Sequence, residues 1–428
     1  MNLKDPIEDS PYMYKFIKDI IDNCGPRMPC SLQEKKAATM IKNEMDKFCD
    51  HTEIESFYCH PRAFLGYIKV IIVFTLISFI LYFLISIYYN FYWISSLVAI
   101  LFILNLLSML ILWNEFFNYR EFIDPFFKKK ESQNVIGTFK SKGELKKVLI
   151  FSGHHDSALQ FNLLKYLKIG YPIIIFLGLI VLFLWFIVSG LIFILSFVYL
   201  DIYKSFFIFT LILFILGIPS LVALFFFVSF GEKANKVPGA VDNLSAVSIV
   251  LGLGKFLKMN REMIPENTEI RLISFGCEEA GLRGAYRYVE KHLDELKHLD
   301  AECVNMDAIQ SPNSISIIDF EPSTRTHHSE IVAQKLIKAA QNAKLNVRTS
   351  SLGGSGSLEK IFGQISGGTD ATAFSKFKVK SANISAIDLK KMLDFYHQPT
   401  DTVDKIEKGA LENVLKLCIN YILLSTDQ

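Results

Sequence analysis

Four long apolar segments most constrain what this chain can fold into. The 428-residue sequence is 51% hydrophobic and has 37 phenylalanines, and the excess is concentrated in residues 65–89, 93–113, 171–200 and 205–230. Apart from Lys69 they are almost free of charge, and each is long enough to cross a bilayer core, which takes about 20 residues. The sequence therefore predicts four membrane helices, arranged as two hairpins.

The two predicted hairpins interrupt one soluble domain. Each adds an even number of crossings, so the soluble parts stay on one side of the membrane. Lysine and arginine gather on the domain side of the hairpins, against Lys204 alone on the other side, and the positive-inside rule then places the domain in the cytoplasm. We expect domain parts at 1–64, 116–168 and 232–428, and transmembrane hairpins at 65–115 and 169–231.

Two adjacent glutamates stand at the end of a predicted strand. Residues 268–275 alternate β-branched and apolar side chains like a buried strand, and residues 282–296 show the spacing of a helix. Glu278 and Glu279 lie between them, at the edge of an α/β sheet where ligands and catalytic groups collect. Standing alone, the pair is typical of a solvated acidic turn.

Other imidazole and carboxylate side chains also lie at the ends of predicted strands or in the loops just after them. This mixture of ligands suits zinc. A set of five with one shared carboxylate makes a two-metal centre, and the reaction class that this implies is hydrolysis. The full set is His154, Asp156, Asp242, Glu278, Glu279, Asp307 and His397.

The remaining pattern predicts an α/β fold with a mixed central sheet flanked by helices. Residues 134–140 and 147–153 read as two strands of a hairpin. Seven cysteines at irregular spacings, with no CxxC pair, indicate neither a disulfide framework nor a structural zinc knuckle. Further predicted elements are a strand at 52–58 and at 301–306, and helices at 12–24, 31–48, 329–343 and 408–424.

Five motifs in order resemble those of the co-catalytic zinc exopeptidases of the leucyl aminopeptidase and glutamate carboxypeptidase type. They are GHHDS at 153–157, PGAVDNLSA at 238–246, FGCEEAGLRGA at 275–285, VNMDA at 304–308 and YHQPTDT at 396–402. The resemblance implies the zinc exopeptidase fold for nearly all of the soluble part. Ala246, where the family usually has glycine, and the inserted hairpins depart from it.

The resemblance also implies a role for each residue of the set. One zinc ion would be held by His154 and Asp307, and a second by Glu279 and His397. Asp242 would bridge the two ions. Asp156 would orient His154 by accepting its other ring proton, and Glu278 would be the general base.

Two further residues are candidates for substrate binding. Tyr396 resembles a tyrosine that carboxypeptidase members use on the tetrahedral oxyanion, and an ordinary buried aromatic is the alternative. Asp370, in the GTDATAF segment, resembles a residue of the loop that shapes the substrate pocket in related peptidases. A helix cap is the alternative for Asp370.

The resulting hypothesis is a membrane-embedded exopeptidase with two zinc ions, favoured as an aminopeptidase over a carboxypeptidase. A one-zinc, glutaminyl-cyclase-like acyltransferase and a non-catalytic membrane scaffold are the alternatives. The expected partners are a peptide substrate and the lipid bilayer, without nucleic acid, because no basic patch with interleaved aromatics is present. The oligomeric state stays open. The second hairpin lies between His154 and Asp242, which suggests lipidated or membrane-derived peptides as substrates, and plain anchoring is the alternative.

Overall fold

The chain forms two compact units in a computed structural model that describes residues 10–87, 94–198, 202–229, 231–352, 354 and 363–426. The first unit comprises Met1–Pro61, Lys129–Gln160 and Gly231–Gln428. The second comprises Arg62–Lys128 and Phe161–Phe230. The sheet and every predicted site residue belong to the first unit, and the four long apolar segments belong to the second.

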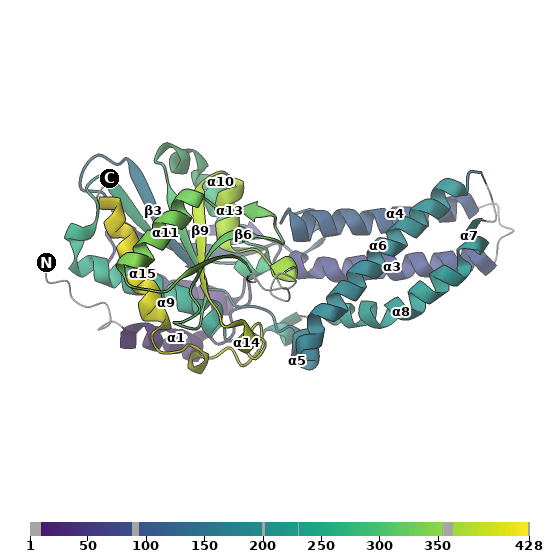
Figure 1. Cartoon of the computed structure of the whole chain (residues 1–428), viewed down its shortest axis with the longest axis horizontal. Helices are drawn as coiled ribbons and strands as arrows, with labels where there is room; N and C mark the ends of the chain where they lie inside the picture. The colour runs from purple at the N-terminus through teal and green to yellow at the C-terminus, as the bar shows by residue number, and fades with distance from the viewer. Residues whose placement is uncertain are drawn as a thin grey trace. The chain divides into compact units, whose positions relative to one another are not determined.

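The first unit is built on a mixed sheet of nine strands among the described residues (Figure 1). The strands are β1 (His51–Cys59), β2 (Lys130–Phe139), β3 (Lys147–His154), β4 (Thr268–Phe275), β5 (Glu302–Ile309), β6 (Ser316–Glu321), β7 (Thr326–His327), β8 (Arg348–Ser351) and β9 (Lys380–Ala386). Their order is β1-β2-β4-β3-β5-β9-β6-β7, with β8 paired to β6. The central strands β4, β3, β5 and β9 run parallel, so their carboxyl ends share one edge.

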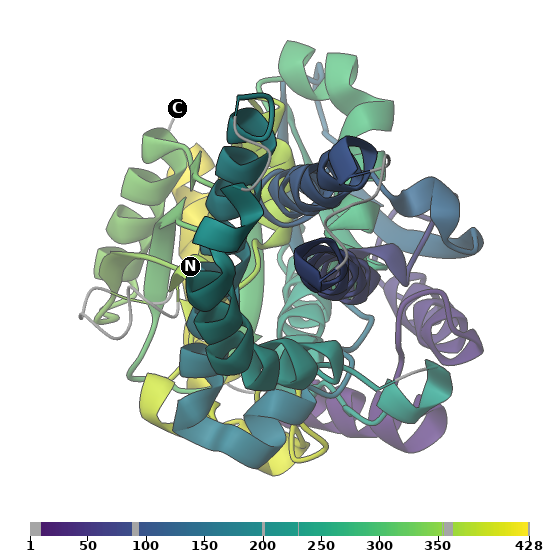
Figure 2. The same ribbon diagram turned by 90° about the vertical axis from the view of Figure 1, so that its right-hand side faces the viewer.

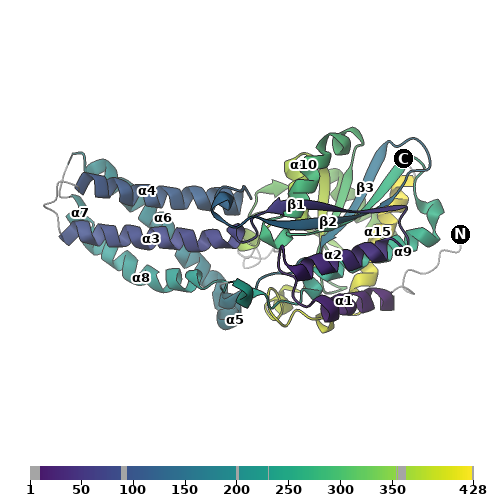
Figure 3. The same cartoon turned by 180° about the vertical axis from the view of Figure 1, so that it is seen from behind.

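Helices cover both faces of this sheet, as predicted for an α/β fold. The central strands are continuous apolar runs because both of their faces are buried. In β3, Leu149 and Phe151 pack into one core, and Val148 and Ile150 pack into the other. The first core is formed with α1 (Ser10–Cys24), α2 (Leu32–Met45), α9 (Ser245–Met259), α11 (Glu330–Asn342) and α15 (Ala410–Thr426), and the second with α10 (Arg283–His298) and α13 (Asp370–Lys376). Figure 3 shows α2 beside β1 and β2.

The predicted hairpin of 134–140 and 147–153 is wrong. Both strands form, but β4 lies between them, antiparallel to β2 and parallel to β3. The loop that joins β2 to β3 is held instead by the segment before β4, where Lys142 and Gly143 donate backbone hydrogen bonds to the carbonyl of Glu266. A local strand pattern does not show that a distant strand inserts between two neighbours in sequence.

The second unit contains the four long apolar helices. They are α3 (Ala63–Ile87), α4 (Ile94–Leu112), α6 (Tyr171–Leu195) and α8 (Phe207–Phe225), and the short α5 (Asn162–Leu167) and α7 (Ile202–Ser205) accompany them. Within the unit α3 packs on α4 and α8, and α6 packs on α4 and α8 (Figure 2). Inside the bundle the indole of Trp185 stacks on Phe79 at 4.3 Å and donates a 2.6 Å hydrogen bond to Ser78.

By length and composition, five helices of the described part could cross a membrane. Four are those of the second unit, with mean hydropathies between 2.5 and 2.9. The fifth, Ala240–Met259, has a mean hydropathy of 1.4 and is 94% buried inside the protein. Its α9 part packs against β3, β4 and β5 in the first unit, so burial in the core accounts for its apolar character.

One buried arginine joins segments that are far apart in the first unit. Arg27, in the loop between α1 and α2, donates from Nε to the carbonyl of His155 at 2.8 Å. Its two terminal nitrogens donate to the carbonyls of Gly25, Pro238 and Gly239. Burial lowers the pKa of Arg27 to about 10, which leaves the guanidinium charged near neutral pH. The N-terminal loop thus fixes the segments that lead from His154 and into Asp242.

The substitution Arg27→Lys tests this connection. Lysine keeps the charge but lacks the planar fork of donors, so several buried carbonyls lose their partner. We expect the free energy of unfolding to fall by about 3 kcal/mol, measured by thermal and denaturant unfolding of the detergent-solubilised protein. Arg287→Lys, on the surface of α10, is the control. Equal stability of the two variants would show that Arg27 does not hold these segments.

Candidate metal centre

The shared carboxyl edge of three neighbouring strands brings the first site residues together. His154 is the last residue of β3 and pairs in parallel register with Phe275, the last residue of β4, after which Glu278 follows. Asp307 lies near the end of β5, on the other side of β3. Ligand atoms of His154, Glu278 and Asp307 all lie within 4.8 Å of one another.

Asp242 lies between two imidazoles. Its Oδ1 is 3.2 Å from Nε2 of His154, and its Oδ2 is 3.2 Å from Nε2 of His397. Oε1 of Glu279 lies 3.4 Å from the same nitrogen of His397. The structure therefore gathers all five side chains that the sequence singled out as ligands, with each oxygen of one carboxylate facing a different histidine.

The backbone around Asp242 is held by side chains on both sides. Asn243 donates from Nδ2 to the carbonyl of Met306 at 3.0 Å, which ties this segment to β5. Asp401 accepts the N–H of Val241 on Oδ1 at 2.8 Å and that of Asp242 on Oδ2 at 3.2 Å. The short segment before α9 is thus fixed to β5 and to the loop that carries His397.

Asp156 holds both glutamates as well as His154. Its Oδ1 accepts the backbone N–H of Glu278 at 3.1 Å, and its Oδ2 accepts that of Glu279 at 3.0 Å. Nδ1 of His154 lies 3.4 Å from Oδ1 of Asp156 and 3.2 Å from its backbone carbonyl. Asp156 thus lies against the ring of His154 and also fixes the backbone of both glutamates.

The electrostatics of the cluster are those of carboxylates forced together away from water. Burial raises the pKa of Glu278, Glu279 and Asp307 well above ordinary values, and neighbouring carboxylates raise it further. Burial also opposes ionisation of Asp242, but His154 and His397 outweigh it and hold its pKa below the usual range. Such a set becomes favourable in its charged form when divalent cations lie among the oxygens.

The donor atoms fit zinc. Nε2 of His154 and Oε1 of Glu279 are buried, and neither makes a hydrogen bond of good geometry within the described residues. Each nevertheless lies close to other ligand atoms, and a second group within 4.8 Å is formed by His154, Asp242 and Glu279. Imidazole nitrogens and carboxylate oxygens turned toward one another without hydrogen bonding are the arrangement expected around a metal ion.

The two residues predicted to bind substrate lie beside this cluster. The ring of Tyr396 stacks on His397, with centroids 3.9 Å apart. Asp370 begins α13, is fully buried, and neither of its oxygens has a hydrogen-bond partner among the described residues. Burial raises the pKa of Asp370 to about 7, with Asp156 and Glu321 adding to the shift.

Sequence reasoning missed three contributors to this part of the fold. Arg27 and Asp401 hold the segments around the cluster. Arg27 stands between the first two predicted helices and Asp401 inside the motif YHQPTDT, both as unremarked polar residues. The third is a group of three cysteines, Cys30, Cys59 and Cys277, whose sulfurs meet although they are far apart in sequence. Their spacing carries no local signal.

Part of the chain is similar to known peptidases. Residues 228–422 match the sequence model of the family described as "Peptidase family M28". Over 182 residues the chain is 31% identical to aminopeptidase YwaD of Bacillus subtilis strain 168, which covers 41% of this chain and 35% of that relative. The matched part is thus about a third of the length of the curated relative.

Solved structures share the fold at low sequence identity. A zinc aminopeptidase from Bacillus subtilis aligns with a TM-score of 0.54 and 16% identity over 99% of this chain and 96% of its own. An aminopeptidase from Aneurinibacillus sp. strain AM-1 aligns with a TM-score of 0.53 and 14% identity, over 98% of this chain and 94% of its own. An Acidobacteriales bacterium glutaminyl cyclase aligns with a TM-score of 0.53 and 14% identity, over 97% of this chain and 94% of its own. With residues 228–422 matching peptidase family M28, the resemblance of this chain to the co-catalytic zinc exopeptidases is confirmed.

Proposed function

We propose that the chain is a zinc-dependent exopeptidase with two metal ions, acting as an aminopeptidase at a membrane. The observation that carries this proposal is the position of Asp242, whose two oxygens each lie 3.2 Å from a different histidine. A carboxylate shared by two ions needs one oxygen directed to each. Glu279 and Asp307 then complete the two sides of the cluster.

In this proposal His154 and Asp307 would hold one zinc ion, Glu279 and His397 would hold the other, and Asp242 would be shared between them. Zinc bound there supplies Lewis acidity, which polarises the scissile carbonyl and lowers the pKa of water. Glu278 takes the proton from the attacking water and delivers it to the leaving amine. Its backbone N–H is fixed by Asp156, so its carboxylate stays within the cluster.

The relatives support the aminopeptidase direction. The curated relative is named an aminopeptidase, and solved structures of the same fold include a zinc aminopeptidase. A carboxypeptidase would use Tyr396, whose stacking on His397 is equally that of a packed aromatic ring. A glutaminyl cyclase shares the fold as well. The complete set of ligands around Asp242 favours two ions over the single ion of the cyclase alternative, and it disfavours a scaffold without catalysis.

The membrane part of the proposal rests on α3, α4, α6 and α8, each long and apolar enough to span a bilayer. The basic residues that flank these helices favour a cytoplasmic location for the peptidase unit. The chain enters and leaves the α6 and α8 pair between His154 and Asp242. For this reason we expect the substrates to be peptides whose ends lie near a membrane, including lipidated ones.

Glu278→Gln tests the general base. The amide keeps the shape of the side chain but does not accept the proton, so kcat should fall about a thousandfold while the zinc content stays constant. Activity is measured by mass spectrometry on a peptide pool with N-blocked and C-blocked members. Glu290→Gln, on the exposed side of α10, is the matched control. Trimming from free C-termini would show that the protein is a carboxypeptidase. Unchanged activity of Glu278→Gln would show that Glu278 is not the general base.

The number of metal ions follows from the difference between wild type and Asp242→Ala. Loss of the shared carboxylate should release both ions, so the variant should contain two zinc equivalents fewer per chain by elemental mass spectrometry. Asp319→Ala, in β6, is the control. A difference of one equivalent would favour the one-zinc cyclase, and no difference would refute the proposed centre.

Acylated and unacylated versions of one peptide test the substrate class. If membrane-proximal peptides are the substrates, the protein in lipid nanodiscs should show a higher kcat/KM for the acylated version, because the acyl chain concentrates that peptide at the bilayer. The advantage should shrink when excess empty nanodiscs compete for the peptide. Equal cleavage of both versions would show that the apolar helices anchor the protein without selecting acylated substrates.

A further inference from the structure

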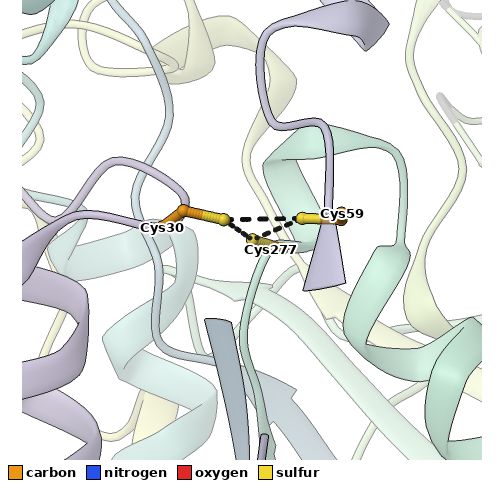
Figure 4. Close-up of side chains that lie close together, drawn as sticks. All are labelled: Cys30, Cys59 and Cys277. Atoms are coloured by element: carbon orange, nitrogen blue, oxygen red, sulfur yellow. Dashed lines mark hydrogen bonds between the residues drawn. The ribbon is translucent and has the colours of Figure 1, made fainter. Parts of the chain in front are cut away.

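Three cysteines from separate segments meet in the first unit (Figure 4). Cys30 lies just before α2, Cys59 ends β1, and Cys277 lies between β4 and Glu278. The Sγ atoms are 3.4 Å apart for Cys30 and Cys59, 3.3 Å for Cys30 and Cys277, and 3.5 Å for Cys59 and Cys277. The three sulfurs thus form a nearly equilateral triangle.

The distances between the three sulfurs fit a shared metal ion better than a disulfide bond. A disulfide would bring two sulfurs to about 2.05 Å and leave the third out, whereas all seven cysteines are free thiols. Zinc–sulfur bonds of about 2.3 Å place thiolates around one ion at separations of about 3.8 Å. The observed distances need an opening of only a few tenths of an ångström to reach this value, with the ion slightly out of the plane.

Two of the three thiols are buried, and Cys30 is half-buried. Cys277 is fully buried and Cys59 is 1% exposed, and both pack against Phe57 and Ala280. Burial of this kind protects thiols from oxidants in solution. Three sulfurs that face one another are a donor set that soft metal ions prefer.

The loops that carry two of the cysteines share one buried carboxylate. Glu34, in the first turn of α2, accepts the backbone N–H of Cys30 on Oε2 at 2.8 Å and that of Cys277 on Oε1 at 3.0 Å. Ser132 donates its hydroxyl to the same Oε1 at 2.9 Å. Cys30 and Cys277 both have positive φ angles, 59° and 54°, in the left-handed region that favours glycine. The structure therefore holds both loops in an unusual conformation that directs their thiols to one point.

We propose that Cys30, Cys59 and Cys277 bind one thiophilic metal ion, zinc(II) or copper(I), at a site distinct from the carboxylate and imidazole cluster. The ion would link the N-terminal loop, the end of β1 and the loop before Glu278. Its effect on the reaction would be one of positioning, because Cys277 is the neighbour of the proposed base. The site itself depends on the three thiols and not on the proposed peptidase function.

The test uses the full chain in detergent with the Asp242→Ala substitution, which removes the other candidate centre. Chelated and reduced protein is titrated with cadmium(II), and a thiolate-to-cadmium charge-transfer band should saturate at one equivalent. Adding Cys59→Ser should abolish the band, and adding Cys418→Ser, a buried thiol on α15, should leave it unchanged. A missing band in the Asp242→Ala protein, or a band that persists in Cys59→Ser, would overturn the proposal.

A second measurement needs no cysteine substitution, in case Cys59→Ser does not fold. X-ray absorption of the Asp242→Ala protein, as purified and after loading with zinc(II) or copper(I), should show sulfur neighbours at about 2.3 Å. The as-purified sample identifies which ion the site takes. Only nitrogen and oxygen neighbours in every sample, or a disulfide between two of the three cysteines by peptide mapping, would contradict the site. Failure of the peptidase assays would leave both measurements unaffected.

Discussion

The burial of several carboxylates side by side is the constraint on which the rest of this structure depends. Glu278 is buried, Glu279 and Asp307 are half-buried beside it, and burial raises the pKa of each. Such a cluster keeps its shape only when every segment that enters it is held elsewhere. The holding groups are mostly backbone hydrogen bonds, from Glu278 and Glu279 to Asp156, and from Val241 and Asp242 to Asp401. Buried polar groups of the fold thus place these few side chains.

The residues that hold these segments in place include two near the start of the chain, Arg27 and Glu34. Arg27, in the loop between α1 and α2, fixes the segments beside His154 and Asp242, and Glu34, in α2, fixes the loop before Glu278. Neither residue would coordinate a metal ion. Their importance lies in preorganisation, because a two-metal centre requires its ligands to be in place before the ions arrive. Changes in the N-terminal segment should therefore act on metal affinity as well as on stability.

Local patterns in the sequence sufficed for most elements and for the ligand cluster. The strands that end at His154 and Phe275 are short apolar runs with polar ends, and their parallel pairing brings the following residues together by geometry alone. What could not be predicted depends on distant segments. The insertion of β4 between β2 and β3, the four carbonyls on Arg27 and the meeting of Cys30, Cys59 and Cys277 all join residues with no periodic relation in sequence.

The apolar segment Ala240–Met259 has a consequence for the way the chain is made. During synthesis the protein exposes five stretches that are long and apolar enough to cross a membrane, yet this one ends 94% buried among strands. If the other four crossed a membrane and this one inserted as well, the count of crossings would become odd, and His397 would emerge on the side opposite to His154. Its mean hydropathy of 1.4, well below the 2.5 to 2.9 of the other four, and the charge of Asp242 at its start oppose that outcome. In the proposed membrane protein, Asp242 would thus also help to keep His154 and His397 in one compartment.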